Sequence, residues 1–348
     1  MHGFTELDTL LGSVPARVVT LLRTVDIGQG SEGLYRNQLP GVLASLARRA
    51  RVASVTASSE IEGIIVPDQI RAENIIEGRA MVLRTRSEQE LAGYRDALDY
   101  LFQSAWQPVN LGLVLHLHRL LFGRTASPGG QFKPHDNVVV DRAADGSTTV
   151  RFRPVPAART EFYMAELIDR FQAAMATGAH HPVLLIGLFV LDLTIVHPFE
   201  DGNGRVARVI TNALLADSGY GVVRYVSLEQ LIADSADEYY QALLSSTRGW
   251  HEHRADPWPW LGYFVATLAE AYRLFGQRAA ADRSTGNKQD RVRDYVRRQA
   301  PDVFRLADIR QALPGISDPT IRIVLDQLRK EDIVTVDGVG RAATWRRV

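Results

Sequence analysis

The stretch "VHPFEDGNGRVAR", residues 196–208, contains a histidine, two adjacent acids, a Gly-Asn-Gly turn and two arginines. Gly202 and Gly204 allow the backbone to approach a ligand closely, and helical spacing resumes at Arg205. Backbone amides at the start of a helix attract anions. Arg205 and Arg208 are three residues apart, so their guanidinium groups lie on one helix face. The stretch therefore predicts a phosphate-binding turn that opens a helix.

Two further residues of this stretch indicate phosphoryl or nucleotidyl transfer. Asp201 is placed to hold Mg²⁺, which commonly takes one or two carboxylates together with phosphate oxygens. His197 can accept a proton from an incoming hydroxyl, because an unperturbed imidazole titrates near neutrality. A lone histidine before proline, or a lone Gly-x-Gly, would be an ordinary helix end or turn. Their combination favours a functional site, because a fold gains little from charge concentrated at a glycine turn.

Residues 197–208 resemble the Fic motif, HPFx(D/E)GNGRxxR, and agree with it at every defined position. The resemblance extends to "GGQFKPHDNVVV" (129–140), which resembles the segment before the family's flap hairpin. It also extends to "DEYYQAL" (237–243) and "WPWLGYFV" (258–265), which resemble its later core helices. The resemblance implies a helical core that moves AMP from ATP to a Tyr, Thr or Ser hydroxyl of a target protein, or of the enzyme itself, and releases pyrophosphate.

The resemblance also implies a role for each residue of the motif. His197 is the general base, Asp201 is the Mg²⁺ ligand, and Phe199 anchors the loop in the core. The family's kinase-like branch carries lysine at the position of Gly204, so this glycine favours adenylylation over phosphorylation. Gly202, Asn203 and Gly204 line the anion hole, and Arg205 contacts the phosphates. Arg208 holds the γ-phosphate.

A second stretch, "SSEIEG" at residues 58–63, resembles the inhibitory motif of the same family, (S/T)xxxE(G/N). Ser58 and Glu62 are four residues apart and share a helix face, and Gly63 follows. The resemblance implies that Glu62 pairs with Arg208 and prevents the γ-phosphate from binding productively. One arginine cannot serve a carboxylate and a phosphate at once. The alternative is an ordinary solvated helix end with Gly63 as its C-cap.

Other site residues have alternative interpretations of similar weight. Phe132 and Lys133 belong either to the flap that docks the target in an extended conformation or only to the start of a hairpin. Tyr239 and Tyr240 contact the base or ribose of the nucleotide, or one of them is a core residue. The two histidines of "VLHLHRLLF" (114–122) alternate on opposite helix faces, and we interpret both as structural.

The sequence predicts a mainly α fold: a helical Fic core with a β-hairpin flap, an N-terminal helical inhibitory region and a C-terminal winged helix. The expected domains are 1–105, 106–281 and 288–348, with a polar linker at 282–290. Two β-branched runs around Asp145-Gly146 predict the hairpin at 136–156. Apolar periodicity predicts helices at 34–50, 88–104, 160–175, 181–195, 205–218, 235–246 and 259–282.

The C-terminal residues predict three short helices (288–300, 305–315 and 317–333) followed by a strand, a turn and a strand (334–348). This order resembles a winged helix-turn-helix. Residues 288–348 carry thirteen Lys plus Arg and nine Asp plus Glu, a net charge of +4. Thr320 and Arg322 are the main candidates for DNA contacts, among apolar neighbours that fit a reading helix poorly. Protein docking or formation of a homodimer is therefore favoured over DNA binding.

The composition excludes several classes of function. Forty Lys plus Arg balance forty Asp plus Glu, so no overall field attracts nucleic acid or an acidic membrane. Cysteine is absent, which excludes disulfides, thiolate catalysis and cysteine metal sites. The N-terminus lacks the basic start and apolar run of a signal peptide, and the most apolar stretch, 183–191, is too short to span a bilayer. We therefore expect a soluble, cytoplasmic protein without a membrane partner.

Two alternative functions remain open at this stage. The same site could remove AMP from a modified protein, with Glu62 positioning the attacking water. Alternatively, the chain is a non-enzymatic regulator in which the Fic core senses nucleotide and the winged helix binds DNA.

Overall fold

The computed structural model describes residues 3–38, 40–80, 82–103, 106, 108–142, 148–285, 288–338 and 343–347. The fold is mainly helical, which confirms the predicted class. The first helices are α1 (Leu7–Leu11), α2 (Ala16–Gln38), α3 (Pro40–Ile61), α4 (Gln69–Ile76), α5 (Arg86–Gln103) and α6 (Leu111–Phe122). After the hairpin strands β1 (Val139–Arg142) and β2 (Thr148–Phe152) follow α7 (Ala157–Thr177), α8 (Pro182–Val196), α9 (Asn203–Asp217), the 3₁₀ turn η1 (Gly221–Arg224), α10 (Leu228–Asp234), α11 (Ala236–Thr247) and α12 (Trp258–Thr285). The C-terminal elements are α13 (Lys288–Arg298), β3 (Val303–Arg305), α14 (Leu306–Ala312), α15 (Asp318–Lys330), β4 (Val334–Asp337) and β5 (Thr344–Arg347).

Two compact units divide the chain. The larger unit comprises Met1–Gln38 and Leu43–Phe275, and the smaller comprises Leu39–Val42 and Gly276–Val348. The larger unit therefore joins the predicted N-terminal region and most of the predicted core in one body. The division falls within α12.

The helix predicted at 34–50 is two helices. α2 ends at Gln38 and α3 begins at Pro40, while Leu39 lies outside the described residues. Proline has no backbone N–H and clashes with the preceding turn, so it starts a helix far more readily than it continues one. The prediction relied on apolar spacing alone, and that spacing continues across the break between the two helices.

The predicted linker at 282–290 contains the boundary between two helices, and its role as a domain linker stays a prediction. α12 continues to Thr285 and α13 begins at Lys288, so most of this polar stretch is helical. Gly286 and Asn287 lie outside the described residues. Once a helix is nucleated, each further residue adds a hydrogen bond, so a polar composition does not end it.

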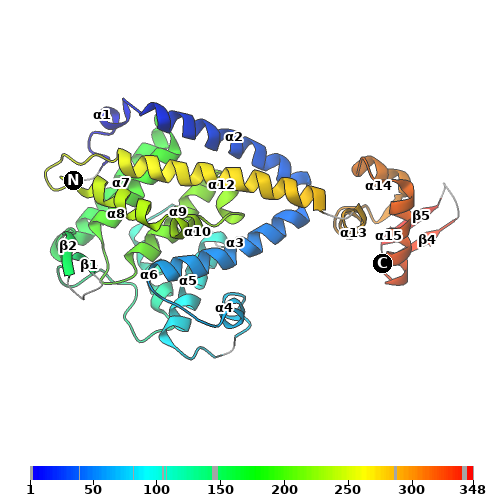
Figure 1. The fold of residues 1–348 in the computed structure, drawn as a ribbon, viewed down its shortest axis with the longest axis horizontal. Coiled ribbons are helices and arrows are strands. Elements are labelled where there is room, and N and C mark those ends of the chain that lie inside the picture. Colours follow the sequence, from blue (N-terminus) through cyan, green and yellow to red (C-terminus); the bar gives the residue numbers. More distant parts are fainter. Residues whose placement is uncertain are drawn as a thin grey trace. The chain divides into compact units, whose positions relative to one another are not determined.

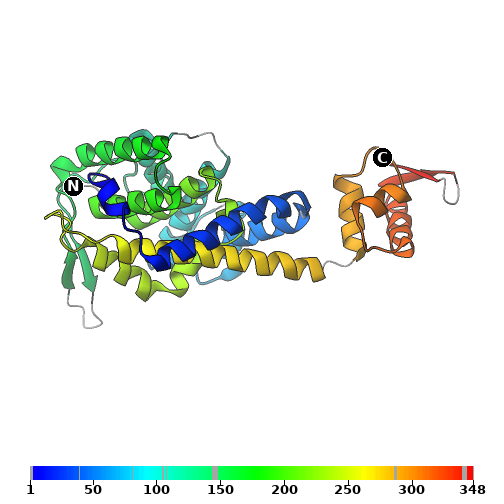
Figure 2. The ribbon, with the colours of Figure 1, turned by 90° about the horizontal axis from the view of Figure 1, so that it is seen from above.

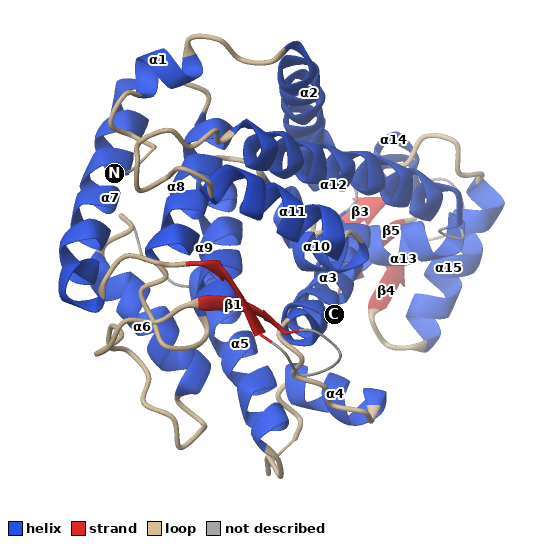
Figure 3. Cartoon of the chain, turned by 60° about the vertical axis from the view of Figure 1, so that its left-hand side comes forward, coloured by secondary structure: helices blue, strands red, loops and turns tan. Residues whose placement is uncertain are grey.

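The buried helices α8 and α9 form the centre of the larger unit. Almost every residue of α8 is buried, as expected for a helix that is apolar on all sides. α8 packs against α7 and α9, and α9 also packs against α5 and α6 (Figure 3). Pro182 stands in the first turn of α8, and the helix ends at His197, before Pro198. This pair of helices therefore holds the motif loop between them.

Long helices flank this centre. α2 and α12 lie side by side in both views (Figures 1 and 2). Their contact is tight, because a Cβ added at Gly28 would lie 2.5 Å from the ring of Tyr272. The aromatic rings of Tyr35 and Phe275 meet edge to face, with centroids 5.4 Å apart. Glycine at residue 28 thus permits the close helix packing.

The predicted hairpin is present as β1 and β2, drawn in red among the helices of this unit in Figure 3. The strands are antiparallel, with Val140 opposite Val150 and Asp141 opposite Thr149. The turn predicted at Asp145-Gly146 lies outside the described residues. β2 packs against α11, which anchors the hairpin to the helical body.

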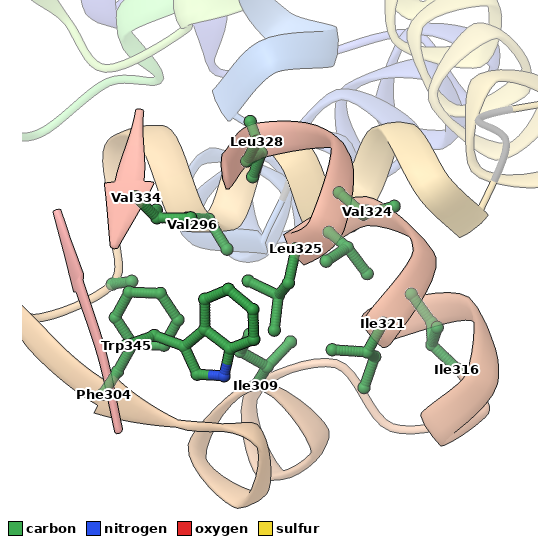
Figure 4. Packing of buried hydrophobic residues seen from close by; sticks show 12 residues of the cluster. Val296, Phe304, Ile309, Ile316, Ile321, Val324, Leu325, Leu328, Val334 and Trp345 are labelled. Carbon is green, nitrogen blue, oxygen red and sulfur yellow. The ribbon is translucent and has the colours of Figure 1, made fainter. Parts of the chain in front are cut away.

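The smaller unit contains the predicted helices and strands. Its antiparallel sheet has the order β3-β5-β4. The predicted turn between the last two strands falls in a stretch where residues 339–342 lie outside the described residues. α13, α14 and α15 pack on a core that includes Val296, Phe304, Ile309, Leu325 and Trp345 (Figure 4). The winged-helix interpretation and its partners stay predictions.

Within the part of the chain that the structure describes, no helix combines the length and the apolar character needed to cross a bilayer.

Candidate active site

The motif loop is held by two residues with positive φ. His197 caps the end of α8 with a φ of 50°, a left-handed conformation that is uncommon for a residue with a side chain. Gly202 caps the start of α9 with a φ of 79°. A Cβ at Gly202 would lie 2.9 Å from the Phe122 ring, so this glycine serves both conformation and space. The chain thereby reverses between two buried helices within five residues.

Phe199 and Asn203 fix the loop from within. The Phe199 side chain is fully buried, as the resemblance implied. Asn203 Oδ1 accepts from the Phe199 amide at 2.9 Å, and its Nδ2 donates to the Phe199 carbonyl at 2.8 Å. The Asn203 side chain is therefore committed to the loop. The first-turn backbone amides of α9, which lack acceptors within the helix, are the groups offered to an anion.

His118 joins the loop to the segment before the hairpin. Its Nδ1 accepts from the Gly130 amide at 2.9 Å, so Nε2 carries the proton and donates to the Asp201 carbonyl at 3.1 Å. The ring stacks on Phe199 with centroids 3.8 Å apart. Burial lowers the pKa of His118 to about 4, so the imidazole is neutral at pH 7. His118 therefore has a structural role, and the part of the structure that it holds is the motif loop.

His197 has one ring nitrogen free to act as a base. Nδ1 lies 3.3 Å from the Thr194 carbonyl, which can only accept, so Nδ1 carries the proton and Nε2 has the lone pair. Burial lowers the pKa of His197 to about 4, and the nearby Lys133 ammonium acts in the same direction. The imidazole is therefore neutral and able to accept a proton at physiological pH.

Phe132 and Lys133 precede the hairpin, which starts at Val139. The Phe132 ring lies 6.0 Å from that of Phe199. Lys133 is buried, and its Nζ donates to Asn137 Oδ1 at 2.9 Å and to the Val196 carbonyl at 3.2 Å. Burial lowers the pKa of Lys133 to about 8. In this structure the Lys133 ammonium supports the loop, and the docking role of both residues stays a prediction.

Asp201 and Arg205 lie on the α5 side of α9. The Asp201 side chain is 57% exposed, whereas that of Arg205 is 1% exposed. Arg205 Nη1 donates to Glu90 Oε2 at 2.7 Å, Nη2 lies 3.4 Å from Asp201 Oδ1, and the guanidinium carbon lies 4.9 Å from the Phe122 ring centroid. In this structure the Arg205 guanidinium is surrounded by Glu90, Asp201 and the Phe122 ring. Its contact with phosphate stays a prediction.

The residues fit a magnesium ion that arrives with a nucleotide. Among the described residues no group of three or more acids and histidines could hold a metal by itself. Mg²⁺ commonly needs only one or two carboxylates when phosphate oxygens supply the rest. The exposed Asp201 carboxylate follows this pattern, because it stands at the helix start that attracts phosphates.

Arg208 is held by both predicted residues of the second motif. Its Nη2 donates to Glu62 Oε1 at 2.7 Å, and its Nε donates to Ser58 Oγ at 2.9 Å. The Arg208 side chain is 5% exposed and that of Glu62 is 30% exposed. A Cβ at Gly204 would lie 2.4 Å from Glu62 Oε1, so glycine at this position leaves room for the carboxylate. Gly63 has a φ of 72°, as a helix C-cap does.

One cleft of about 390 Å³ brings most of these residues together. Its walls come from the end of α3, the hairpin, the ends of α8 and α9, and α11. Tyr239 is buried at its base, and Tyr240 is half-buried with Arg151 over its ring at 5.0 Å. The predicted residues that line the cleft are Glu62, His197, Asn203, Gly204, Arg208, Tyr239 and Tyr240. Asp201 and Phe132 line a neighbouring pocket.

Residues 108–215 match the model of the Fic/DOC family. This segment, less than half of the chain, is therefore similar to Fic domains. It contains the whole 197–208 motif and the helices α6 to α9, apart from the last two residues of α9.

Proteins similar to this chain are named protein adenylyltransferase Fic. The protein of Drosophila melanogaster is 27% identical over 134 residues, which cover 38% of this chain and 25% of the relative. The protein of Drosophila virilis is 29% identical over 137 residues, with the same two shares. The chain thus aligns with about a quarter of the length of these relatives.

Solved structures agree with the fold. A Fic family protein from Desulfovibrio desulfuricans has a TM-score of 0.63 at 21% identity, and the alignment covers 97% of each chain. A Fic-1 fragment from C. elegans has a TM-score of 0.58 at 21% identity, covering 75% of this chain and 73% of that one. At these identities the likeness concerns the fold alone.

Sequence reasoning missed the buried partners of the Fic motif. Glu90 holds Arg205, and Asn212 Nδ2 donates to the Arg208 carbonyl at 3.0 Å. The fully buried Glu229 in turn holds Asn212. Glu229 Oε1 accepts from Tyr94 Oη at 2.8 Å and from Asn212 Nδ2 at 2.6 Å. The only available signal in the sequence was a polar residue at an otherwise apolar helix position. Such a residue indicates a buried polar contact but does not identify the other residue.

Proposed function

We propose that the chain is a protein adenylyltransferase that moves AMP from ATP to a hydroxyl side chain of a target protein or of itself. The observation that carries the proposal is the cleft, because it joins a neutral histidine, an anion-attracting helix start and a buried arginine. The Fic domain and its adenylyltransferase relatives support the same reaction class.

His197 starts the reaction. Its Nε2 takes the proton of the target hydroxyl, while the bond from Nδ1 to the Thr194 carbonyl keeps the ring in the required tautomer. The hydroxyl oxygen forms a bond to the α-phosphorus of ATP. The bond from that phosphorus to the oxygen bridging to the β-phosphate breaks, and pyrophosphate leaves with the electron pair. The products are AMP-modified protein and pyrophosphate.

The phosphates are oriented by the start of α9. The first-turn amides and the helix dipole favour negative charge there. Asp201 would hold Mg²⁺, which neutralises charge that develops on the leaving pyrophosphate. Arg208 would hold the γ-phosphate, and Tyr239 and Tyr240 would bound the space for the base and ribose. The resemblance to the Fic motif and the position of these residues in the cleft and the adjoining loop support these roles.

We further propose that Glu62 inhibits the enzyme by occupying Arg208. One guanidinium cannot serve a carboxylate and a phosphate at once, so the Glu62–Arg208 pair must separate before the γ-phosphate binds productively. Separation costs about 1.5–3 kcal/mol, the usual free energy of a hydrogen bond to a charged group. The 2.7 Å contact between Glu62 Oε1 and Arg208 Nη2 supports this role. The same carboxylate, next to His197 in the cleft, is also compatible with positioning water for removal of AMP.

The hairpin and the smaller unit are the proposed partner surfaces. The exposed side chains of Val140 and Val150 leave the hairpin open to an extended target segment. For the smaller unit we favour protein docking or dimerisation over DNA binding. Sedimentation of the full chain tests dimerisation, and a gel-shift assay with duplex DNA tests the other hypothesis.

The central test uses the pure protein with Mg²⁺ and ATP labelled on the α-phosphate. We expect label on the protein, loss of that label with His197→Ala, and loss of Mg²⁺-dependent turnover with Asp201→Ala. Retained transfer by a folded His197→Ala variant would remove the base assignment. Release of label from a modified protein, without addition, would support the reverse reaction, and nucleotide binding with neither reaction would support the regulator.

A further inference from the structure

Four charged side chains of alternating sign form a ring beside the motif loop. Arg86 Nε donates to Glu90 Oε1 at 2.5 Å, and Arg205 Nη1 donates to Glu90 Oε2 at 2.7 Å. Arg205 Nη2 lies 3.4 Å from Asp201 Oδ1, and Arg86 Nη2 lies 4.0 Å from Asp201 Oδ2. Glu90 on α5 and Asp201 on the loop therefore share the same two arginines.

The two carboxylates do not share them equally. Both contacts of Glu90 with the arginines are short, whereas the contacts of Asp201 with the arginines are at the limit of a hydrogen bond or beyond it. Asp201 Oδ1 also accepts from the Gly202 amide at 2.6 Å, and Oδ2 is the oxygen left for a cation. Glu90 is also 6% exposed, so water screens its pairing with Arg205 far less than it screens the pairing of Asp201, which is 57% exposed. Arg205 is thus directed mainly at Glu90, and the Asp201 carboxylate keeps its capacity to bind a cation.

We propose that Glu90 is a positioning residue that keeps Asp201 available to a divalent cation bound with the nucleotide. The proposal rests on the function proposed above. Without the Glu90 charge, the buried Arg205 guanidinium would have Asp201 as its nearest carboxylate, and the 3.4 Å contact would shorten. A carboxylate paired with guanidinium is a poorer metal ligand, because the same oxygens serve both.

Arg86 acts in the opposite direction. Its side chain is 64% exposed and its Nη2 lies near Asp201 Oδ2, where it competes with a metal ion for the same negative charge. Removal of this charge makes the carboxylate more attractive to a cation, although solvent and salt screen the effect. Opposite shifts from two neighbouring residues of α5 distinguish the ring from a general loss of structure.

The test measures ADP binding by calorimetry at increasing Mg²⁺ in the full chain. ADP lacks the γ-phosphate, so Glu62 on Arg208 does not compete with it. The variants are Glu90→Gln and Arg86→Gln, and the matched control is Glu88→Gln. Glu88 lies on the same helix, is 6% exposed and pairs with Arg71, outside the ring.

We expect Glu90→Gln to raise the Mg²⁺ concentration for half-maximal ADP binding about tenfold, as loss of a residue that orients a metal ligand does. Arg86→Gln should lower it about two- to threefold, and Glu88→Gln should leave it unchanged. An unchanged requirement in a folded Glu90→Gln variant would overturn the proposal. If Glu90→Gln does not fold, Arg86→Gln decides: a lower requirement supports the ring and an unchanged one overturns it.

Failure of the underlying function has a different outcome. ADP binding to the wild type that is independent of Mg²⁺ would overturn both the metal role of Asp201 and this proposal. Mg²⁺-dependent binding that none of the variants alters would overturn the role of Glu90 alone.

Discussion

The two arginines of α9 lie one turn apart and are both buried, yet their surroundings differ. On the α5 side, Arg205 pairs with Glu90, whose side chain is 6% exposed. On the α3 side, Arg208 pairs with Glu62, whose side chain is 30% exposed. Glu90 lies within α5, whereas Glu62 follows the last residue of α3.

The different exposure of Glu90 and Glu62 indicates which of the two ion pairs is easier to break. Separation of Glu90 from Arg205 would leave two buried charges without water, which is costly. Glu62 can turn to solvent at the end of its helix, so release of Arg208 costs less. The two arginines thus combine one contact that is costly to break with one that is easier to break, as the proposed inhibition by Glu62 requires.

The largest expected effect is on stability. Arg205→Ala should lower the free energy of unfolding by about 3–5 kcal/mol, because Glu90 loses its buried partner. Arg208→Ala should lower it by only about 1–2 kcal/mol, because Glu62 then reaches water. Urea unfolding followed by tryptophan fluorescence measures both. Equal losses would remove the distinction between the two sides.

The next effect is on activity. Glu62→Gly should raise self-adenylylation about ten- to a hundredfold, because Arg208 becomes free for the γ-phosphate. The matched control is Glu60→Gly, at an exposed position of the same helix end, which carries a similar glycine cost of about 1 kcal/mol without touching Arg208. Transfer from α-labelled ATP measures the change.

The double variant Glu62→Gly with Arg208→Ala sharpens this result. It should lack the gain, because Arg208 is the group that Glu62 occupies. A gain that survives the loss of Arg208 would place the partner of Glu62 elsewhere.

A smaller effect is expected at Ser58. Ser58→Ala removes the Oγ that accepts from Arg208 Nε at 2.9 Å, but Arg208 Nη2 still donates to the Ser58 carbonyl. Loss of one such bond, about 0.5–1 kcal/mol, should raise transfer about two- to fivefold. Ser59→Ala is the control, because Ser59 Oγ donates to the Val55 carbonyl on the same helix. Equal effects of the two variants in the transfer assay would contradict a role of Ser58 in holding Arg208 in its pair with Glu62.

The smallest expected effect is that of pH. The folded pKa of His197 is about 4, below the ordinary value of about 6.5, so the neutral base is present at all pH values above about 5. Transfer by Glu62→Gly should therefore stay flat between pH 5.5 and 8 and fall as pH drops through 4. An inflection near 6.5 would show that burial does not shift the base.

The lowered pKa values also predict that the free energy of unfolding decreases as pH falls, because proton binding and folding are thermodynamically linked. His197 binds a proton less readily when folded, so unfolding becomes easier as pH falls from the unfolded pKa of about 6.5 towards 4. His118, whose pKa is also lowered to about 4, adds to this effect. Burial raises the pKa of Asp192 to about 7, which acts in the opposite direction over the same interval. NMR titration of the two imidazoles therefore measures the shifts directly, and pKa values near 6.5 would contradict them.

Much of the helical framework could be predicted from periodicity. The helices expected at 160–175, 181–195, 205–218, 235–246 and 259–282 agree with α7, α8, α9, α11 and α12 within three residues at each end. Apolar spacing determines such helices, because each must bury one face or all of its surface. The prediction of one helix across Pro40 was wrong, and α12 extends three residues beyond its predicted end at 282.

By itself, the sequence determined the loop chemistry: two glycines that let a ligand approach the backbone, a histidine, two adjacent acids and two arginines at helical spacing. It also paired Glu62 with Arg208, but only through resemblance to a second motif. The tertiary structure alone decided that Glu90 faces Arg205 and that His118 joins Gly130 to Asp201. Local spacing constrains residues within a turn or two, whereas contacts across 115 or 83 positions depend on how the helices pack.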